Sequence, residues 1–331
     1  MASGGHTTRA RFDEYAKQWL DSYAGRTARG LSDSTRADYR RSIELYAIPF
    51  FERYRLAEIE PPDVRRFVQS FEKRGLRASS IRKNLAPVKV LFATAYEDGA
   101  IGANPTQGLR VNGAMRQGED EEVRKPKALT RQELRLVIQA IPEDWQPFFT
   151  LLAQTGLRIS EAIAVNWGDL DLGVAPRLRV RRQIYKGQPK RLKSRHSVRE
   201  LPLTPRMADT LRAMRARSYA GEESLIFPTR AGTPLSVRNL RRRILDPAVE
   251  AVGFDWVSFH TFRHTCASLL FAGGKDIKQV QEWLGHADPG FTLRTYVHLM
   301  DEGLGPADFL DDALAVSPTL GRDEPGLPQR F

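Results

Sequence analysis

The chain has 331 residues, a formal net charge of +11 at neutral pH and one cysteine, Cys266. Its 41% hydrophobic and 27% charged residues are ordinary for a globular protein and exclude a wholly disordered chain. A lone cysteine excludes an internal disulfide framework and a zinc cluster built on cysteines. No apolar run approaches the roughly 18 residues of a membrane span, and the N-terminus lacks the apolar core of a secretion signal, so we expect a cytoplasmic protein.

The excess of basic residues indicates a polyanionic partner. The 51 Lys and Arg residues outnumber the 40 Asp and Glu residues. Nucleic acid is the simplest partner for such a charge, although an arginine-rich solvated surface would give the same balance. At roughly 150 residues per domain, the length predicts about two domains.

Residues 8–105 are predicted to form a small helical domain. Apolar residues at helical spacing predict a first helix from Phe12 to Tyr23, and Ser34 is placed to cap a second. Pro61 is expected to open a third helix, because proline is well tolerated in the first turn.

A fourth helix is predicted after Ser79 or Ser80, either of which can cap it, and Gly99 is expected to close it. Pro87 within this segment predicts a kink or a later start of the helix. Basic side chains are interleaved near the end of the domain, and we expect four of them to bind DNA: Arg77, Arg82, Lys83 and Lys89.

Residues 106–126 are polar, contain three glycines and lack clear periodicity, which predicts a linker. A second domain is predicted over residues 127–315, opening with a helix that Thr130 caps. Alternating apolar and polar residues predict strands within 178–203. The expected fold is therefore mostly α with a small antiparallel β-sheet in the second domain, followed by a disordered tail over 316–331.

Arg158 and Glu161 lie three residues apart on a predicted helix, beside the apolar stripe of Ile159, Ala162 and Ile163. One interpretation is an exposed ion pair worth a few tenths of a kcal/mol. The other is an arginine fork that a carboxylate holds in place, because the planar guanidinium matches two phosphate oxygens.

The segment FHTFRHTCASLL places His260 and Arg263 on one side of a helix, with His264 one turn from His260. A histidine pair at this spacing can bind zinc, but Arg263 between them would repel a metal, and no Glu follows His260 as in the HExxH motif. Partly buried, hydrogen-bonded histidines are the simpler interpretation of this segment taken alone.

Further along the chain, Gly285 is expected to end a helix, so that His286 starts a loop and can point into a cleft. Thr292 can cap the next helix, and Tyr296 lies at the border of its apolar stripe. Taken alone, Tyr296 is a core or interface tyrosine. Lys193 lies in the most basic stretch, RLKSRHSVRELPL, at an expected hairpin turn.

Together these side chains suit one reaction, the attack of a tyrosine on a phosphodiester. A phenol has a pKa near 10 and needs a base or a hydrogen-bond partner at neutral pH. Two guanidiniums and a histidine donor would stabilise the charge that develops on the phosphorane, and a lysine could protonate the leaving 5′ oxygen.

The same residues resemble the tyrosine recombinase family, also called phage-type integrases. TGLRISEA resembles its first arginine box, KSRHSVRELPL its lysine hairpin, HTFRH its HxxR box and LGHADPGFTLRTYVH its last box. The helical first domain, ending in IGANP, is similar to the family's core-site-binding domain. The resemblance implies one catalytic set, supported by Glu161: Arg158, Lys193, His260, Arg263, His286 and Tyr296. Lys186 and Lys190 remain alternatives for the lysine.

The resemblance also implies a mechanism. Tyr296 would form a 3′-phosphotyrosyl bond, four protomers would hold two duplex DNA sites, and strands would exchange through a Holliday junction without metal, ATP or another cofactor. An accessory directionality factor is possible. Further expected DNA-binding residues lie in the second domain: Arg179, Arg181, Arg238, Arg241, Arg242 and Arg243. An amphipathic segment near the C-terminus, PADFLDDALA, is expected to dock on a neighbouring protomer.

About ten residues precede the first predicted helix, which leaves no room for the additional arm-site-binding domain of many phage integrases. The last box favours a phage or mobile-element integrase, and a chromosome or plasmid dimer resolvase is the alternative. A catalytically silent DNA-binding protein is a weaker alternative, because every expected catalytic residue is present. A type IB topoisomerase is weaker because the core-site-binding domain and the segment PADFLDDALA favour recombination, and a zinc hydrolase using His260 and His264 is weaker because Arg263 would repel a metal.

Overall fold

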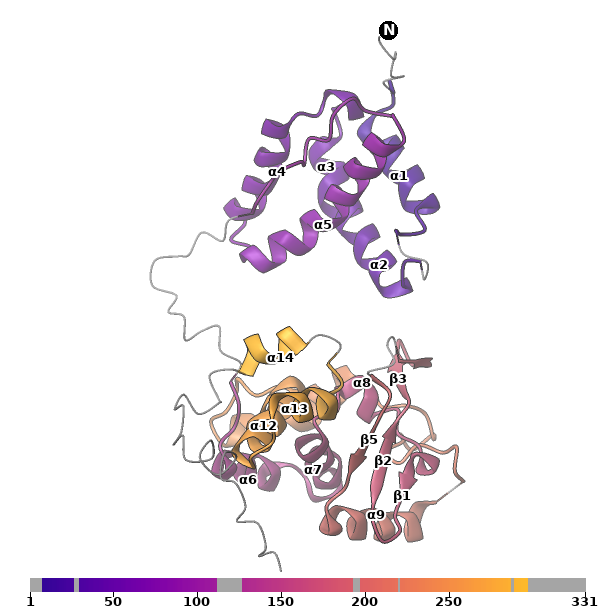
Figure 1. The fold of residues 1–331 in the computed structure, drawn as a ribbon, viewed down its shortest axis with the longest axis vertical. Coiled ribbons are helices and arrows are strands. Elements are labelled where there is room, and N and C mark those ends of the chain that lie inside the picture. The colour runs from indigo at the N-terminus through magenta and orange to yellow at the C-terminus, as the bar shows by residue number, and fades with distance from the viewer. Residues whose placement is uncertain are drawn as a thin grey trace, which may run out of the picture. The chain divides into compact units, whose positions relative to one another are not determined.

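The computed structural model describes residues 8–26, 30–111, 127–192, 197–219, 221–286 and 289–296. The chain divides into two compact units, Met1–Glu119 and Asp120–Phe331, which are drawn in Figure 1. Among the helices in these ranges, none has the length and apolarity needed to cross a bilayer.

Among the described residues of the first unit, all regular elements are helical, and one isolated β-bridge joins Arg11 to Arg55. Proline at the start of α4 and a capping box between Glu60 and Asp63 fix the beginning of that helix. The second helix is capped by Ser32, whose hydroxyl accepts from the Thr35 amide, so the predicted cap at Ser34 is wrong by two residues. The elements are α1 (Phe12–Ser22), α2 (Asp33–Ser42), the π-helix η1 (Ile43–Ala47), α3 (Ile48–Phe51), the 3₁₀ turn η2 (Leu56–Glu58), α4 (Pro61–Lys73) and α5 (Ala78–Glu97).

Helix α5 starts well before Pro87, so the predicted later start is wrong. Its cap is Arg77 rather than Ser79 or Ser80. Pro87 lies inside the helix and is buried, and apolar packing of this face offsets the hydrogen bond that proline cannot donate.

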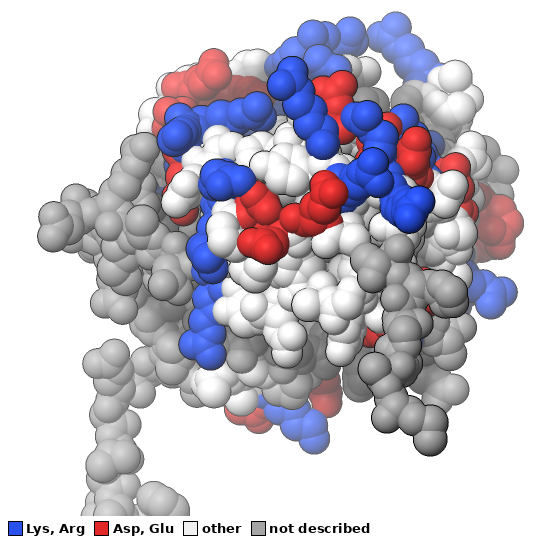
Figure 2. Space-filling view, turned by 90° about the horizontal axis from the view of Figure 1, so that it is seen from above, with Lys and Arg blue, Asp and Glu red and all other residues white. Residues whose placement is uncertain are grey.

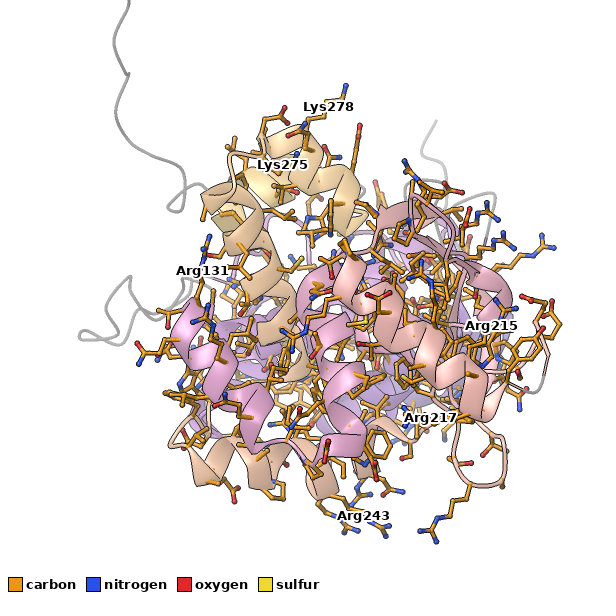
Figure 3. All side chains as sticks on the ribbon, turned by 90° about the horizontal axis from the view of Figure 1, so that it is seen from below. Arg131, Arg215, Arg217, Arg243, Lys275 and Lys278 are labelled. Carbon is orange, nitrogen blue, oxygen red and sulfur yellow. The ribbon has the colours of Figure 1, made fainter. Side chains whose placement is uncertain are left out.

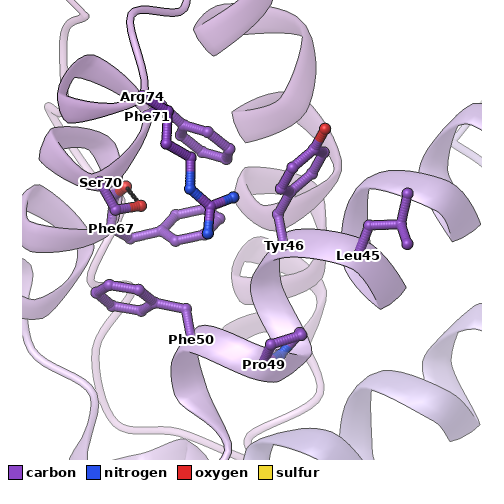
Figure 4. A pocket seen from close by; sticks show the side chains of 8 residues that line it. All are labelled: Leu45, Tyr46, Pro49, Phe50, Phe67, Ser70, Phe71 and Arg74. Carbon is purple, nitrogen blue, oxygen red and sulfur yellow. Dashed lines mark hydrogen bonds between the residues drawn. The ribbon is translucent and has the colours of Figure 1, made fainter.

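Phenylalanine rings fill the core of the first unit. The rings of Phe12 and Phe51 lie 5.0 Å apart, and those of Phe67 and Phe71 lie 4.8 Å apart. A cavity of about 190 Å³ opens beside these rings, where the guanidinium of Arg74 lies over Tyr46 (Figure 4). Leu109 and Val111, within residues 106–111 of the predicted linker, pack against the core of the first unit. Residues 112–126 lie outside the described residues.

The second unit combines helices with two small sheets. Thr130 caps its first helix as predicted, since its hydroxyl accepts from the Glu133 amide at 3.2 Å. The helices and helical turns are α6 (Arg131–Ala140), η4 (Glu143–Trp145), α7 (Gln146–Thr155), α8 (Ile159–Ala162), η5 (Trp167–Asp169), α9 (Pro205–Ser218), α10 (Val237–Leu240), η7 (Arg241–Leu245), α11 (Asp246–Ala251), α12 (Phe259–Ala272), α13 (Ile277–Leu284) and α14 (Pro289–Tyr296).

Both sheets are antiparallel. The first has the order β1-β2-β5, and the second is the hairpin β3-β4, which turns at Lys186 and Gly187, both with positive φ. The strands are β1 (Leu170–Asp171), β2 (Arg177–Val180), β3 (Arg182–Tyr185), β4 (Gln188–Arg191) and β5 (Arg199–Pro202). In Figure 1 the sheet lies to one side of the helices α7, α12 and α13. The predicted fold class, mostly helical with small antiparallel sheets, is confirmed.

Candidate active site

The first arginine is held at the start of α8. Gly156 ends α7 in the left-handed conformation, and Arg158 follows as the residue that precedes α8. Its Nη1 donates to Glu161 Oε1 at 2.8 Å, and its amide donates to Oε2 at 3.1 Å. The carboxylate is 1% exposed and the arginine side chain 38% exposed, so this is a half-buried pair rather than an ion pair on the surface.

A second arginine, which the sequence did not single out, also binds this carboxylate. Arg199 Nη2 donates to Glu161 Oε2 at 2.9 Å. Burial alone would raise the pKa of Glu161, but the charges of Arg199 and Arg158 outweigh it and the pKa lies below its ordinary value. The signal was present in β5, because Arg199 alternates with the buried Leu201 and Leu203 and therefore faces the interior.

Helix α12 supplies Arg263 and His260. Arg263 is 2% exposed and donates to the Gly156 carbonyl at 2.7 Å and to the Leu284 carbonyl at 2.8 Å. Burial, followed by the charge of Arg158, lowers its pKa to about 9, which leaves it protonated at neutral pH. His260 is exposed, and desolvation followed by the charges of Arg263 and Arg158 lowers its pKa. The two predicted arginines and His260 therefore face one region.

The end of α13 brings His286 to the same region. Gly285 closes the helix with φ +68°, as predicted, and its carbonyl accepts from Arg158 Nη2 at 3.4 Å. His286 follows at once and shares a 2.7 Å hydrogen bond with Thr292 Oγ1. Thr292 lies within α14, which begins at Pro289, so its predicted capping role is wrong. Burial, followed by the charge of Arg263, lowers the pKa of His286 to about 3.

Tyr296 lies at the last described position, packed between α12 and α13. Its side chain belongs to a buried cluster with Cys266, and its hydroxyl lies 2.7 Å from His264 Nδ1. Burial raises the pKa of Tyr296 to about 12, and burial, followed by the nearby His260, lowers the pKa of His264 to about 4. His264 is therefore a partly buried, hydrogen-bonded histidine, the simpler of the two interpretations of its segment, and its partner is the tyrosine. Within the described ranges, no three His, Cys, Asp or Glu side chains form a group that could hold a metal.

Lys193 lies outside the described residues, so the structure does not place it. The two alternative lysines lie on the β3-β4 hairpin and approach the same ring. Lys186 Nζ lies 5.7 Å and Lys190 Nζ 5.2 Å from the ring centroid of Tyr185. Lys193 thus stays a prediction.

The residues expected to bind DNA in the first unit lie on or before α5. Arg77 precedes the helix, and Arg77, Arg82 and Lys83 are exposed. Lys83 forms an ion pair of 3.3 Å with Asp38, and Lys89 is half-buried, with its ammonium donating to the Leu109 carbonyl. Lys89 therefore has a structural partner within the unit.

In the second unit, several of the expected DNA-binding arginines form ion pairs. Arg179 binds Glu200 at 2.8 Å and Arg241 binds Asp246 at 3.1 Å. Figure 2, which looks onto the first unit, shows Lys and Arg there in several groups with Asp and Glu among them. Figure 3 shows Arg243 and Lys278 on opposite sides of the second unit. Arg181 also lies 3.8 Å from Asp169. Arg181 is exposed, as are the remaining members of the predicted set: Arg238, Arg242 and Arg243.

Comparison with solved structures shows the same fold. The integrase of the Tn1549 transposon, solved with a circular intermediate DNA, superposes with a TM-score of 0.72 at 18% identity, covering 93% of this chain and all of that one. A lambda integrase dimer bound to a COC′ core site superposes with a TM-score of 0.63 at 19% identity, covering 88% of this chain and 77% of that one.

Sequence comparisons also relate this chain to recombinases. The tyrosine recombinase XerC of Xanthomonas axonopodis pv. citri is 32% identical over 248 residues, 73% of this chain and 75% of that protein. XerC of Xylella fastidiosa strain 9a5c is 31% identical over 282 residues, 82% and 88% of the two chains. The phage integrase family model matches residues 127–302, and the model of the phage integrase N-terminal SAM-like domain matches residues 11–71. The chain therefore belongs to the phage integrase family and is a site-specific tyrosine recombinase.

Proposed function

We propose that Tyr296 attacks a scissile phosphodiester in a recombination site. The phenol oxygen would form a bond to phosphorus, the bond to the 5′ oxygen would break, and a 3′-phosphotyrosyl bond and a 5′ hydroxyl would result. The observation that carries this proposal is the anchoring of Arg263 and Arg158 on the consecutive carbonyls of Leu284 and Gly285, directly before His286.

The two guanidiniums suit the binding of a phosphate. Their hydrogen bonds to backbone carbonyls already order the two side chains before DNA binds. Little entropy is therefore lost on binding, and more of the attraction between guanidinium and phosphate can stabilise the transition state. Arg158 is 38% exposed, which leaves part of its fork open to a ligand. Exposed His260 would supply a further donor to the non-bridging oxygens.

One proton must leave the attacking phenol oxygen, and another must reach the leaving 5′ oxygen. Tyr296, with its pKa raised to about 12, carries its proton at neutral pH, and the proton must leave as the phenol oxygen attacks. The nearby imidazole of His264 is neutral at that pH and shares a hydrogen bond with the hydroxyl. We assign the protonation of the leaving 5′ oxygen to Lys193, with Lys186 and Lys190 as alternatives.

The partner in this proposal is duplex DNA, bound in the cytoplasm by four copies of the chain, with an accessory directionality factor possible. The solved relatives support it, since the Tn1549 and lambda integrases were seen with DNA. Of the ten basic residues named above, those other than Lys89 would contribute phosphate contacts, because the Lys89 ammonium already donates to the Leu109 carbonyl. Six to ten such contacts would weaken binding by about 10³–10⁵ between 50 and 200 mM salt.

Two biological roles fit this chemistry, integration of a mobile element and resolution of dimers. Relatives named integrase and relatives named XerC both match the chain. We favour a phage or mobile-element integrase, because the sequence of the last box, FTLRTYVH, is more similar to those of phage integrases.

Plasmids carrying two copies of the native site test the proposal. A recombinase gives deletion or inversion products, whereas relaxation of supercoils without recombinants would indicate a topoisomerase and contradict it. Joining of two separate plasmids at unlike sites would support an integrase, and efficient resolution of direct repeats alone would support the resolvase alternative.

A further inference from the structure

Three consecutive backbone carbonyls at the end of α13 each accept from a different arginine. Trp283 accepts from Arg199 Nε at 2.8 Å, Leu284 from Arg263 Nη2 at 2.8 Å and Gly285 from Arg158 Nη2 at 3.4 Å. The last carbonyls of a helix lack partners within it and carry the negative end of its dipole, so they suit guanidiniums. One helix end thereby fixes three arginines that come from separate parts of the chain.

Arg199 reaches Arg158 by a second route as well. The two arginines bind opposite oxygens of the same Glu161 carboxylate, at 2.9 Å and 2.8 Å. Arg199 thus touches both anchors of Arg158, the carboxylate and the end of α13. Its Nη1 also donates to the Ser197 carbonyl at 2.9 Å, at the end of the segment that contains Lys193.

Exposure separates the roles of the two arginines. The side chain of Arg158 is 38% exposed and that of Arg199 only 6% exposed. A side chain so buried, with its donors directed at protein carbonyls and a carboxylate, cannot offer a fork to a phosphate. Removing the Arg199 side chain would leave the buried Glu161 with one cationic partner instead of two, and would remove the hydrogen bond to the Trp283 carbonyl at the end of α13.

We propose that Arg199 is a positioning residue, which holds Glu161 and the end of α13 so that Arg158 presents its guanidinium to the scissile phosphate. The inference rests on the proposed function of Arg158. The role is specific to arginine, because no other side chain reaches a carboxylate and two carbonyls with one planar group.

Arg199→Ala, Arg199→Lys and the control Arg212→Ala test this inference. Arg212 on α9 likewise donates to a carboxylate, Asp209, and to the Leu172 carbonyl. Helix α9 lies at the other end of the unit from α13 and α14 (Figure 1). The measurements are the single-turnover rate of covalent adduct formation on a nicked duplex of the native site, the DNA affinity, and the thermal midpoint.

We expect Arg199→Ala to slow adduct formation by about 10–100-fold, with Arg199→Lys between it and wild type, DNA affinity within about three-fold, and Arg212→Ala at the wild-type rate. Positioning through Arg158 further predicts non-additivity: in an Arg158→Lys background, Arg199→Ala should add less than about three-fold. Should Arg199→Ala fail to fold, Arg199→Lys in both backgrounds carries the same comparison.

A wild-type rate for Arg199→Ala, or an equal slowing in both backgrounds, would overturn the inference. Absence of an adduct with the wild-type protein would instead overturn the proposed function itself. The two failures are therefore distinguishable in one set of reactions.

Discussion

The Nδ1 atom of His264 lies 2.7 Å from the hydroxyl oxygen of Tyr296, and the tyrosine is 1% exposed. The two residues lie on α12 and α14, 32 positions apart in the chain. With the imidazole neutral and the phenol protonated, the hydroxyl donates and Nδ1 accepts. In this structure the proposed nucleophile is thus held inside the protein by one hydrogen bond among the described residues.

Replacing His264 by Ala should destabilise the second unit by about 1–3 kcal/mol, because a buried hydroxyl loses its acceptor. His264→Asn should cost less, since the Asn Oδ1 atom lies near the position of Nδ1. Urea unfolding followed by tryptophan fluorescence measures both. In a Tyr296→Phe background the cost of His264→Ala should shrink, and an unchanged cost would show that the bond contributes nothing to stability.

Stability should fall as the pH is lowered below neutral. The pKa values of His264 and His286 in the fold are about 4 and about 3, against an ordinary value of 6.5. Between about pH 6.5 and pH 4 the unfolded chain therefore binds protons that the folded chain does not. Each such histidine lowers the free energy of unfolding by about 1.4 kcal/mol per pH unit in that window, and neither contributes a slope above pH 7.5.

The variant that checks this slope is His264→Asn, which removes one of the titrating groups. Unfolding free energies at pH 7.5, 6.5, 5.5 and 4.5 should converge between wild type and variant as the pH falls. Parallel curves across the window would show that His264 takes up no extra proton on unfolding.

Gly285→Ala should disturb the arginines as well as the backbone. An added Cβ would lie 2.8 Å from Arg199 Nη1, and φ is +68°. Gly253 has a similar φ of +77° with nothing within 4 Å of the added Cβ, so Gly253→Ala supplies the backbone strain alone. We expect about 1–2 kcal/mol of destabilisation for Gly253→Ala with a wild-type cleavage rate, and slower cleavage for Gly285→Ala. Equal rates for the two variants would contradict the close packing at the end of α13.

Rules that act within one helical turn predicted some of the helix ends, whereas contacts between residues far apart in the chain could not be predicted. Thr130 and Gly285 follow from rules that act within one turn, and both are correct. The interaction of Arg199 with Glu161 joins residues 38 positions apart. The alternation in β5 indicates that Arg199 faces the interior, but it does not identify Glu161 as the partner. Arg158, His260 and Arg263 could be assigned to one site from the sequence only because each lies in a motif that resembles the family's.

The cap at Ser32 shows that tertiary packing can also decide a local feature that the sequence pattern leaves open. Three hydroxyl residues, Ser32, Ser34 and Thr35, lie close together at the start of α2, and the sequence alone does not say which one accepts from an amide of the first turn. The choice depends on where the preceding chain enters the unit, which packing against the core decides.

Cleavage should persist in a chelator, because two guanidiniums would supply the positive charge that a divalent ion supplies in many phosphoryl-transfer enzymes. The measurement is adduct formation in excess EDTA against buffer alone, where equal rates are expected. A loss of activity that added zinc restores would instead support the hydrolase alternative with His260 and His264 as ligands.

The most direct measurement is covalent capture on a nicked suicide duplex of the native site, with wild type and Tyr296→Phe compared at equal DNA occupancy. We predict a protein–DNA adduct with wild type, whose phosphopeptide maps to Tyr296, and intact DNA binding without an adduct for the variant. An adduct of undiminished yield with Tyr296→Phe would contradict the assignment of the nucleophile.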